Sequence, residues 1–524
     1  MNNSYPSIFN DVIGPVMRGP SSSHCAAAVR IGRIVRDLMD GDIENVLIEF
    51  DPQGSLATTH ESQGSDMGLF AGLLGWEPAD ERLLSSKEAL LAAGINVKIK
   101  ISSIKADHPN TYKMTVNNSR ESHTLFAIST GGGIIEVIEI DGVKLSMAGD
   151  YYETLVYAGS DGDRLVAYLS GNIQADEIYL RGSGDLRFVE VKSQGFLALD
   201  TIAALRSKFD IRSLKQIASV LPVLSHRQIR VPFITSTEML EYNRDENLDL
   251  GELAVRYECA RGALSPDQVR EKMTGILDIM QEGIRSGLAG TQYADRILGY
   301  QSGNFRSQME NHRLIDAGVL NRIIMDTTAL MESKSAMGVI VAAPTAGSCG
   351  GLPGACIGAA DAMGLSMADQ VPAMLAGGMV GVFIAAHATF AAEVGGCQAE
   401  CGAGSGMAAA ALVTLAGGST QQAVNAASMA LQNVLGMVCD PVANRVEVPC
   451  LGKNVMAASN ALACANMALS GYDPVIPLDE VIQTMDAVGK MLPSALRCTG
   501  YAGLSVTRTA KEIEKQLAQK ERRS

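Results

Sequence analysis

The chain has 524 residues, of which 47% are hydrophobic and 19% are charged. A chain of this length exceeds what one hydrophobic core supports, so we expect two or three domains. The net charge of −14 argues against nucleic acids and anionic membrane surfaces as partners. Ten cysteines, with no secretory signal at the start of the sequence, favour a cytoplasmic protein over a disulfide framework.

Short β-rich runs alternate with helical patterns over residues 1–150. Branched residues bounded by Gly, Asp or Asn predict four strands, at 45–51, 96–104, 112–118 and 133–142. Apolar residues at helical spacing after a serine-rich start predict a helix over 22–40. The pattern predicts an N-terminal α/β domain within a multidomain α+β protein.

Residues 151–228 have the pattern of a separate small module. Strands are expected at 153–159, 176–183 and 186–193, helices at 163–173 and 201–209, and a closing strand at 217–224. This βαββαβ order is the ferredoxin-like arrangement, here ACT-like, that small-molecule sensing domains often use. Fold alone assigns no function to it.

Residues 229–524 have a mainly helical pattern. Ser265 and Pro266 suit the first turn of a long amphipathic helix over 265–288. Residues 371–392 carry no formal charge, but their apolar content is mostly Ala and Gly. This composition favours a helix buried in a protein core over a membrane span. We therefore expect an all-helical C-terminal domain.

Three cysteines of this C-terminal region lie in loop-like sequences: Cys397 in GGCQAE, Cys439 in VCDPVA and Cys450 in VPCLGK. Their Gly and Pro neighbours fix unusual backbone directions, so these thiols are held in position. Three thiolates without a fourth partner suit an iron–sulfur cluster with one open iron. Inert packing is the simpler alternative. Cys401 is a rival ligand, Cys349 also lies in a glycine-rich turn, and a zinc site using Cys397, Cys401 and a histidine is a third interpretation.

Three hydroxyl-rich segments are suited to binding an anion. Ser21, Ser22, Ser23 and His24 enter the helix expected at 22–40, where free N–H groups and hydroxyls favour a carboxylate or phosphate. An ordinary serine cap with a surface histidine is the alternative. The second segment (54–66) contains His60, Glu61, Gln63 and Asp66, and the third (343–348) contains Thr345, Gly347 and Ser348.

Taken together, these segments resemble the iron–sulfur-dependent L-serine dehydratases, also called L-serine ammonia-lyases. GPSSSH with RIGR, APTAGSCG, GGCQAE, CDPVA with VEVPC, and GLSVTRTAKEI occur in the order of this family's motifs. The resemblance covers nearly the whole chain and is to a single-chain form in which a β-type part precedes an α-type part. It implies a β-type domain at 1–150, an ACT-like module at 151–228 and an α-type catalytic domain at 229–524 that holds the cluster.

The resemblance implies a [4Fe–4S] cluster held by Cys397, Cys439 and Cys450, with one iron free for substrate and no pyridoxal phosphate. Cys349 and Cys401 then become neighbours rather than ligands. The implied reaction dehydrates and deaminates L-serine to pyruvate and ammonium, with the open iron assisting loss of the β-hydroxyl. A homodimer or higher homo-oligomer is also expected. The implied catalytic residues are His24, Ser22 and Ser23, and the implied substrate-binding residues are Ser21, Thr345, Gly347, Ser348, Gln63, Asp66 and His387.

The chain departs from the family's pattern at several substrate-facing positions. Gln63 stands where the family has a histidine thought to lie in the active site, and an amide acts neither as an acid nor as a base. HATFAAE (387–393) replaces NASISGA, which adds His387 and Glu393, and Cys498 replaces the glutamate of RET.

These departures leave other substrates open for the same chemistry. L-threonine is one alternative, and a hydroxymethyl or hydroxy dicarboxylate is another, with His387 and Arg445 as candidates for binding a second carboxylate. An alternative from another class is a non-catalytic sensor in which the module at 151–225 binds an amino acid.

Overall fold

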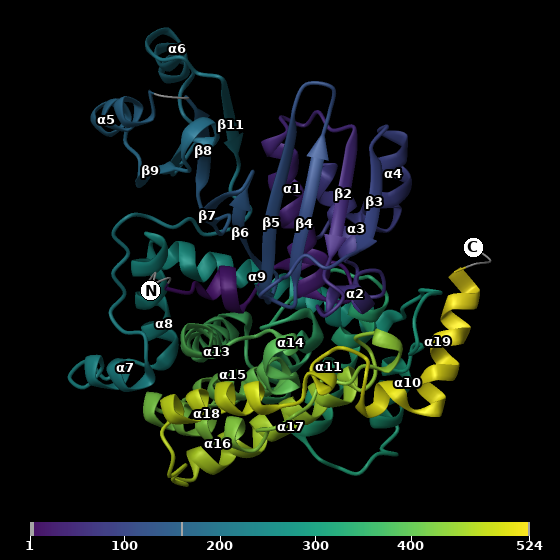
Figure 1. Ribbon diagram of the computed structural model, residues 1–524. Coiled ribbons are helices and arrows are strands. Elements are labelled where there is room, and N and C mark those ends of the chain that lie inside the picture. Colours follow the sequence, from purple (N-terminus) through teal and green to yellow (C-terminus); the bar gives the residue numbers. More distant parts are fainter. Residues whose placement is uncertain (1–4, 159–160, 522–524) are drawn as a thin grey trace.

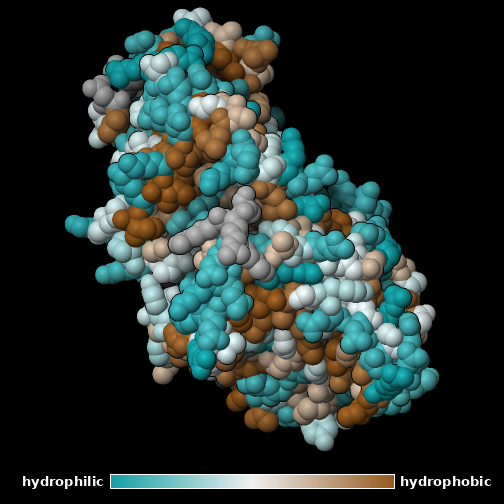
Figure 2. All heavy atoms as spheres, turned by 90° about the vertical axis from the view of Figure 1, so that its right-hand side faces the viewer, coloured by the Kyte–Doolittle hydropathy of each residue, from teal (hydrophilic) through white to brown (hydrophobic). Residues whose placement is uncertain are grey.

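The computed structural model describes residues 5–158 and 161–521 of the chain. Two β-sheets lie in the upper half of Figure 1, and helices coloured from teal to yellow form the lower half. On the side that faces the viewer in Figure 2, a narrower upper part stands on a broader lower part, with polar and apolar residues interspersed. The protein therefore has a mixed α/β architecture with a helical C-terminal region, as the sequence predicts.

A six-stranded sheet forms the core of the N-terminal region. Its strands are β2 (Asn45–Phe50), β3 (Asn96–Ile101), β4 (Thr111–Asn117), β5 (Ser122–Gly131), β6 (Ile134–Ile140) and β7 (Val143–Met147). The strand order is β3-β2-β4-β5-β6-β7, in which only β2 and β3 run parallel. This is the α+β form of the predicted architecture, because antiparallel neighbours need no crossover helix.

Four helices accompany this sheet: α1 (Ala27–Leu38), α2 (Leu56–Thr59), α3 (Ser65–Leu73) and α4 (Ser86–Ala92). Apolar residues of α1 and α3 share one buried cluster with the alternate inward-facing residues of the strands. The two helices approach closely at Gly32 and Gly72, where a Cβ on Gly72 would lie 2.2 Å from the carbonyl oxygen of Val29. The close contact between α1 and α3 holds the start of α1, and with it the serine-rich segment at 21–26, against α3.

Residues 152–217 form a second, four-stranded antiparallel sheet with two helices. The elements are β8 (Tyr152–Tyr157), α5 (Gly162–Asn172), β9 (Glu177–Arg181), β10 (Phe188–Ser193), α6 (Leu199–Lys208) and β11 (Ser213–Ile217), and the strand order is β11-β8-β10-β9. Gly159, the end of the first expected strand, lies outside the described residues.

The closing strand of this sheet is β11, which lies earlier in the chain than the predicted 217–224. After Ile217, the N–H of Ala218 donates to Asp37 and the N–H of Val220 donates to the carbonyl of Gly149, so both bond outside the sheet. Pro222 has no N–H to offer a ladder. The hydrophobic run in this stretch therefore packs between regions instead of continuing the strand.

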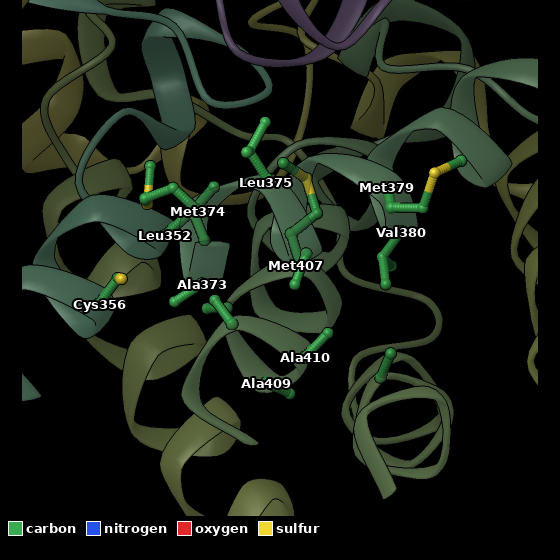
Figure 3. Packing of buried hydrophobic residues seen from close by; sticks show 14 of the residues in the cluster. Leu352, Cys356, Ala373, Met374, Leu375, Met379, Val380, Met407, Ala409 and Ala410 are labelled. Atoms are coloured by element: carbon green, nitrogen blue, oxygen red, sulfur yellow. The ribbon is translucent and has the colours of Figure 1, made fainter. Parts of the chain in front are cut away.

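Helices α7 to α19 form the C-terminal region, and α13 (Met367–His387) lies at its centre. Figure 3 shows Met407 of α15 (Cys401–Leu415) among the buried side chains of α13, with which it shares one hydrophobic cluster. Within the described residues, α13 is the one helix long and apolar enough to cross a membrane, and 78% of its apolar window is buried inside the protein. This burial confirms the prediction that the uncharged stretch at 371–392 belongs to a core helix. The other helices are α7 (Ser236–Tyr242), α8 (Leu250–Gly262), α9 (Pro266–Ala289), α10 (Ser302–Glu310), α11 (Val319–Ser335), α12 (Gly351–Met363), α14 (Ala392–Gly395), α16 (Thr420–Gln432), α17 (Cys450–Leu469), α18 (Leu478–Met491) and α19 (Arg508–Glu521).

The first residues of the chain pack into the helical region. Ile8 and Val12 are buried in the same cluster as α13. The next residues form β1 (Val16–Met17), which pairs antiparallel with β12 (Ile340–Val341). Because β1 leads toward α1, and β12 leads toward the loop at 343–348, this pairing brings two of the three predicted anion-binding segments to the same boundary.

Candidate active site

The serine-rich segment forms one π-helical turn, Ser22–Ala26, directly before α1. His24 in this turn is fully buried, and its Nε2 lies 2.8 Å from the hydroxyl of Thr59. Its Nδ1 lies 3.1 Å from the hydroxyls of both Ser21 and Ser23. The histidine is therefore held in a ring of hydroxyls, and the alternative of a surface histidine beside a serine cap is wrong.

Glu393 extends this group from the helical region. Its Oε1 accepts a hydrogen bond of 3.0 Å from the Ser23 hydroxyl and lies 3.6 Å from His24 Nδ1. Burial lowers the pKa of His24, and the nearby Glu393 carboxylate opposes this shift only in part. Glu393 Oε2 is buried and has no hydrogen-bond partner among the described residues. The site thus contains a buried carboxylate with one acceptor atom unused.

The loop at 343–348 meets the serine-rich turn from the other side. The N–H of Ala346 donates to the Ser22 hydroxyl at 3.1 Å, and the Thr345 hydroxyl donates to Glu400 Oε1 at 2.7 Å. A Cβ at Gly347 would lie 3.1 Å from the same Glu400 oxygen, so a larger residue would crowd the carboxylate. Burial, together with the charge of Cys397, raises the pKa of Glu400 to about 8.

Four cysteines gather next to this carboxylate. Cys397, Cys401, Cys439 and Cys498 belong to one buried cluster, and none forms a disulfide. The thiols of Cys401 and Cys439 lie within hydrogen-bonding reach of Cys397 and hold its pKa well below the ordinary range of a thiol. Burial disfavours the charged form of Lys453, but attraction to Cys397 and Cys439 outweighs it and raises the pKa of the amine. The arrangement therefore favours a thiolate at Cys397.

Cys450 lies at the start of α17 and in an adjoining buried cluster with Cys349. One turn later, the Asn454 amide nitrogen donates to the Gly347 carbonyl at 2.7 Å and lies 3.6 Å from Cys401 Sγ. Asn454 thereby ties the start of α17 to the loop at 343–348 and to the group of four cysteines. Cys349 packs against the Met331 sulfur at 3.7 Å.

The donor set fits an iron–sulfur cluster in its chemistry. Cys397, Cys439 and Cys450 are buried and unoxidised, and Lys453 supplies a compensating positive charge. Among residues 5–158 and 161–521, no three Asp, Glu, His or Cys side chains surround one point as a single metal ion requires. In a [4Fe–4S] cluster each thiolate binds a different iron, so the sulfur atoms lie farther apart than the ligands of a single ion.

Gln63 and Asp66 take different positions in the site. Gln63 is buried, and its amide nitrogen lies 3.5 Å from Cys498 Sγ. Asp66 lies 2.8 Å from Nδ1 of His60 and lines a cavity of about 510 Å³ between the N-terminal and helical regions. Gln63 is thus brought to the cysteines, whereas Asp66 lies at the cavity wall.

His387 is not brought to this group. It is exposed at the end of α13, and its Nε2 lies 3.1 Å from the carbonyl oxygen of Ile234. The prediction that it binds substrate rests on its place in HATFAAE, which replaces NASISGA of the family, but the residue at this end of the segment points away from the site. The other predicted residues lie in the contacts described above, and Ser348 joins them through a 3.1 Å contact with the Thr345 hydroxyl.

Sequence reasoning missed several residues of the site. Glu400 lies inside the GGCQAE motif, and Glu393 is a carboxylate within an otherwise apolar stretch, which is an unusual place for an acid unless it has a role. Nothing in the sequence marks the other missed residues, Thr59, Lys453 and Asn454, because the same residue types occur at ordinary helix positions.

A family model of the serine dehydratase alpha chain matches residues 245–505. The probable L-serine dehydratase alpha chain of Bacillus subtilis (strain 168) is 34% identical over 280 residues, which are 53% of this chain and 93% of that protein. The probable L-serine dehydratase beta chain of the same organism is 40% identical over 152 residues, 29% of this chain and 68% of that protein.

A single-chain relative covers both parts. L-serine dehydratase 1 of Escherichia coli (strain K12) is 26% identical over 499 residues, 93% of this chain and 96% of that protein. Together with the two Bacillus subtilis chains, this match bears out the single-chain arrangement that the order of motifs implies. The chain therefore belongs to the L-serine dehydratase family.

Proposed function

We propose that the protein converts L-serine to pyruvate and ammonium with a [4Fe–4S] cluster held by Cys397, Cys439 and Cys450. The observation that carries the proposal is the meeting of Ser23 with Glu393 across the boundary between the N-terminal and helical regions, beside the buried cysteines. The names of the matching relatives support the substrate, since they are called L-serine dehydratases.

The residues of the site have complementary roles in this proposal. The unused Oε2 of buried Glu393 accepts a hydrogen bond from the substrate ammonium. The hydroxyls of Ser21 and Ser22 and the turn at Thr345–Ser348 donate to the substrate carboxylate. Neutral His24, with Ser22 and Ser23 beside it, handles the proton that leaves the α-carbon, because burial keeps its pKa low enough for it to accept. Gly347 leaves the room that the substrate needs beside Glu400.

The leaving group needs help, because hydroxide departs poorly from carbon. When bound, the cluster supplies a Lewis acid at its open iron for the β-hydroxyl. Loss of the α-proton and the hydroxyl, as water, leaves an enamine. This tautomerises to an imine, and water then hydrolyses the imine to pyruvate and ammonium. Gln63, an amide beside Cys498, donates hydrogen bonds but moves no proton.

The boundaries at 150 and 228, a cytoplasmic location and homo-oligomer formation are further parts of the proposal. We propose that residues 151–228 form a ferredoxin-like, ACT-like module, for which the strand order β11-β8-β10-β9 gives support. The alternative dicarboxylate substrate is not favoured, because Arg445 already pairs with Asp295 at 2.7 Å and His387 lies elsewhere.

The test is release of 2-oxo acid from L-serine by protein purified and reconstituted with iron and sulfide under anaerobic conditions. We expect turnover with L-serine that disappears in air, and at least tenfold lower kcat/KM with L-threonine. No turnover of L-serine by protein that carries about four irons per chain would overturn the proposed substrate. Failure to take up iron at all would overturn the proposed cofactor and favour the sensor alternative.

A further inference from the structure

A second cavity, of about 540 Å³, shares no lining residue with the candidate active site. It forms where the N-terminal segment, α1, α9 and the stretch after β11 come together. Its apolar wall includes Ile13, Leu221, Ile276 and Ile279. A cavity of this volume between several elements is in the range that holds a small organic molecule.

The unusual feature of this cavity is Arg30. Its side chain is only 2% exposed, its Nη1 donates to the carbonyl oxygen of Gly133, and its buried Nε has no partner. No carboxylate among the described residues lies within 4.0 Å of the guanidinium; Asp11 and Glu77 are near enough to act on it electrostatically, but neither forms an ion pair with it. A buried cation without a paired anion is costly, so its retention calls for a partner.

The other charged groups at the cavity leave positive charge in excess. Arg33 pairs with Glu77 at 2.7 Å, so these two neutralise each other. Lys272, half-buried on α9, lines the same cavity and forms no ion pair with a described residue. The cavity thus offers two unpaired cations, Arg30 and Lys272, next to an aliphatic wall.

We propose that this cavity binds a small monocarboxylic acid with a branched aliphatic chain. The carboxylate pairs with Arg30 and Lys272, and the aliphatic part packs against Leu221, Ile276 and Ile279. A polyanion suits the lining less well, because it makes no favourable contact with the aliphatic wall. An apolar molecule also suits it less well, because it leaves both cations unpaired.

The cavity lies next to elements of the candidate active site, but none of the site residues lines it. Arg30 lies on α1, which directly follows the turn that holds His24. Gly14 and Pro15, at the cavity wall, exchange backbone hydrogen bonds of 2.9 and 3.1 Å with Ala342, which precedes the loop at 343–348. A ligand here therefore contacts α1 and the Gly14–Pro15 stretch, which are directly connected to the two segments that carry the predicted substrate-binding residues. This is a suitable place for an effector.

The test is calorimetric titration of the full-length protein with 4-methylpentanoate, with 4-methylpentanamide as the neutral probe. We expect binding of the acid with a Kd below about 1 mM and no binding of the amide at about 10 mM. Lys272→Met weakens the binding by about tenfold, and Ile276→Trp, which fills the cavity, abolishes it. Arg285→Met, on an exposed part of the same helix, leaves it unchanged.

Glu393→Gln separates this inference from the proposed function, because it alters the candidate active site and leaves the second cavity intact. Its binding of 4-methylpentanoate stays as in the wild type. Equal binding of acid and amide, no binding of the acid at about 10 mM, or binding that survives both Lys272→Met and Ile276→Trp would each overturn the proposal. Loss of binding in Glu393→Gln would also overturn it, since the acid would then occupy the active site.

Discussion

Ser23 and Glu393 are separated by 370 positions in the chain, yet the Ser23 hydroxyl donates to Glu393 Oε1 at 3.0 Å in the buried site. One residue comes from the N-terminal region and the other from the segment that follows α13. Neither region builds the site alone, because His24 and the serines around it come from one and the carboxylates Glu393 and Glu400 from the other. In Bacillus subtilis, a probable alpha chain and a probable beta chain each match a portion of this chain.

The first prediction concerns the charge of Glu393. Glu393→Gln keeps the size of the side chain and the hydrogen bond from Ser23, but removes the negative charge that we assign to the substrate ammonium. We expect kcat/KM for L-serine to fall by about tenfold to hundredfold, mainly through a higher KM, because a charge-assisted hydrogen bond is lost from both ground and transition states. Steady-state kinetics of the reconstituted enzyme measures both constants.

Glu310→Gln serves as the matched control, because Glu310 is an exposed carboxylate at the end of α10 with only a surface pair to Arg306. It should leave kcat and KM unchanged. If Glu393→Gln behaves like this control, Glu393 does not bind the ammonium.

The second prediction concerns the cluster ligands. Cys397→Ser, Cys439→Ser and Cys450→Ser should each lose the iron and sulfide that reconstituted wild-type protein holds, about four of each per chain. Cys401→Ser should retain them, because the family resemblance assigns Cys401 as a neighbour. Cys259→Ser, on α8, controls for handling of a cysteine variant. Iron and sulfide analysis with visible absorption gives the result.

The opposite pattern, iron lost in Cys401→Ser and kept in Cys450→Ser, would show that the ligand set is wrong. The structure makes this a sharp comparison, because Cys401 shares the buried cluster of Cys397 and Cys439, whereas Cys450 belongs to the adjoining one.

Much of the fold could be predicted because the local signals are strong. The helix at 265–288 has a capping box formed by Ser265 and Gln268, and its start is confirmed. The sequence predicts the closing strand of the second sheet at residues 217–224, after its true position at Ser213–Ile217, because this run is as hydrophobic as a strand. Its hydrophobic residues are buried by packing against the helical region and the N-terminal sheet, and such long-range packing is not visible in a local pattern.

Only those residues of the site that belong to a sequence motif could be predicted. Ser21 to His24 and the three cysteines follow from motifs, and the structure places most of them together. The contact of Thr59 with His24 and that of Asn454 with Gly347 depend on long-range packing. His387 illustrates the converse, because it belongs to a segment that matches a motif of the family and yet lies outside the site.

The third prediction concerns pH and the anchor of the N-terminal segment. The hydroxyl of Ser7 and the N–H of Ile8 both donate to Glu258, which is fully buried on α8. Burial raises the pKa of Glu258 from 4.5 to about 7; the two donors and Arg261 oppose this rise, and the Asp11 carboxyl adds to it. Between these values the folded protein binds a proton that the unfolded chain has released. Stability from this group is therefore complete below pH 4.5 and is lost as the pH rises through about 7.

Glu258→Gln removes this proton and its pH dependence. The loss of unfolding free energy between about pH 4.5 and pH 8 should be smaller in the variant than in the wild type, by about 3 kcal/mol. Urea denaturation at several pH values measures the difference. Glu252→Gln on the same helix is the control, because the Glu252 side chain is partly exposed and pairs with Arg270. Equal slopes for Glu258→Gln and wild type would contradict the assignment.

The fourth prediction concerns the contact between α13 and the N-terminal segment. A Cβ at Gly381 would lie 2.1 Å from Val12 Cγ1, so even alanine at this position has no room. Gly381→Ala should destabilise the protein by about 1–3 kcal/mol despite the better helix propensity of alanine, because a tightly packed core does not relax freely. Gly171→Ala, in α5 where no atom lies within 4 Å of the added methyl, should instead be neutral or stabilising by up to about 1 kcal/mol.

A double-mutant cycle identifies the clash as the cause. Val12→Ala alone creates a small cavity and destabilises the core by about 1–2 kcal/mol. Combined with Gly381→Ala, it removes the very methyl that the new Cβ would strike, so the double variant should be more stable than the sum of the two single effects predicts. Denaturation curves of the four proteins give the coupling free energy. Strict additivity would mean that α13 shifts away from Val12 to accommodate the new methyl group instead of meeting it.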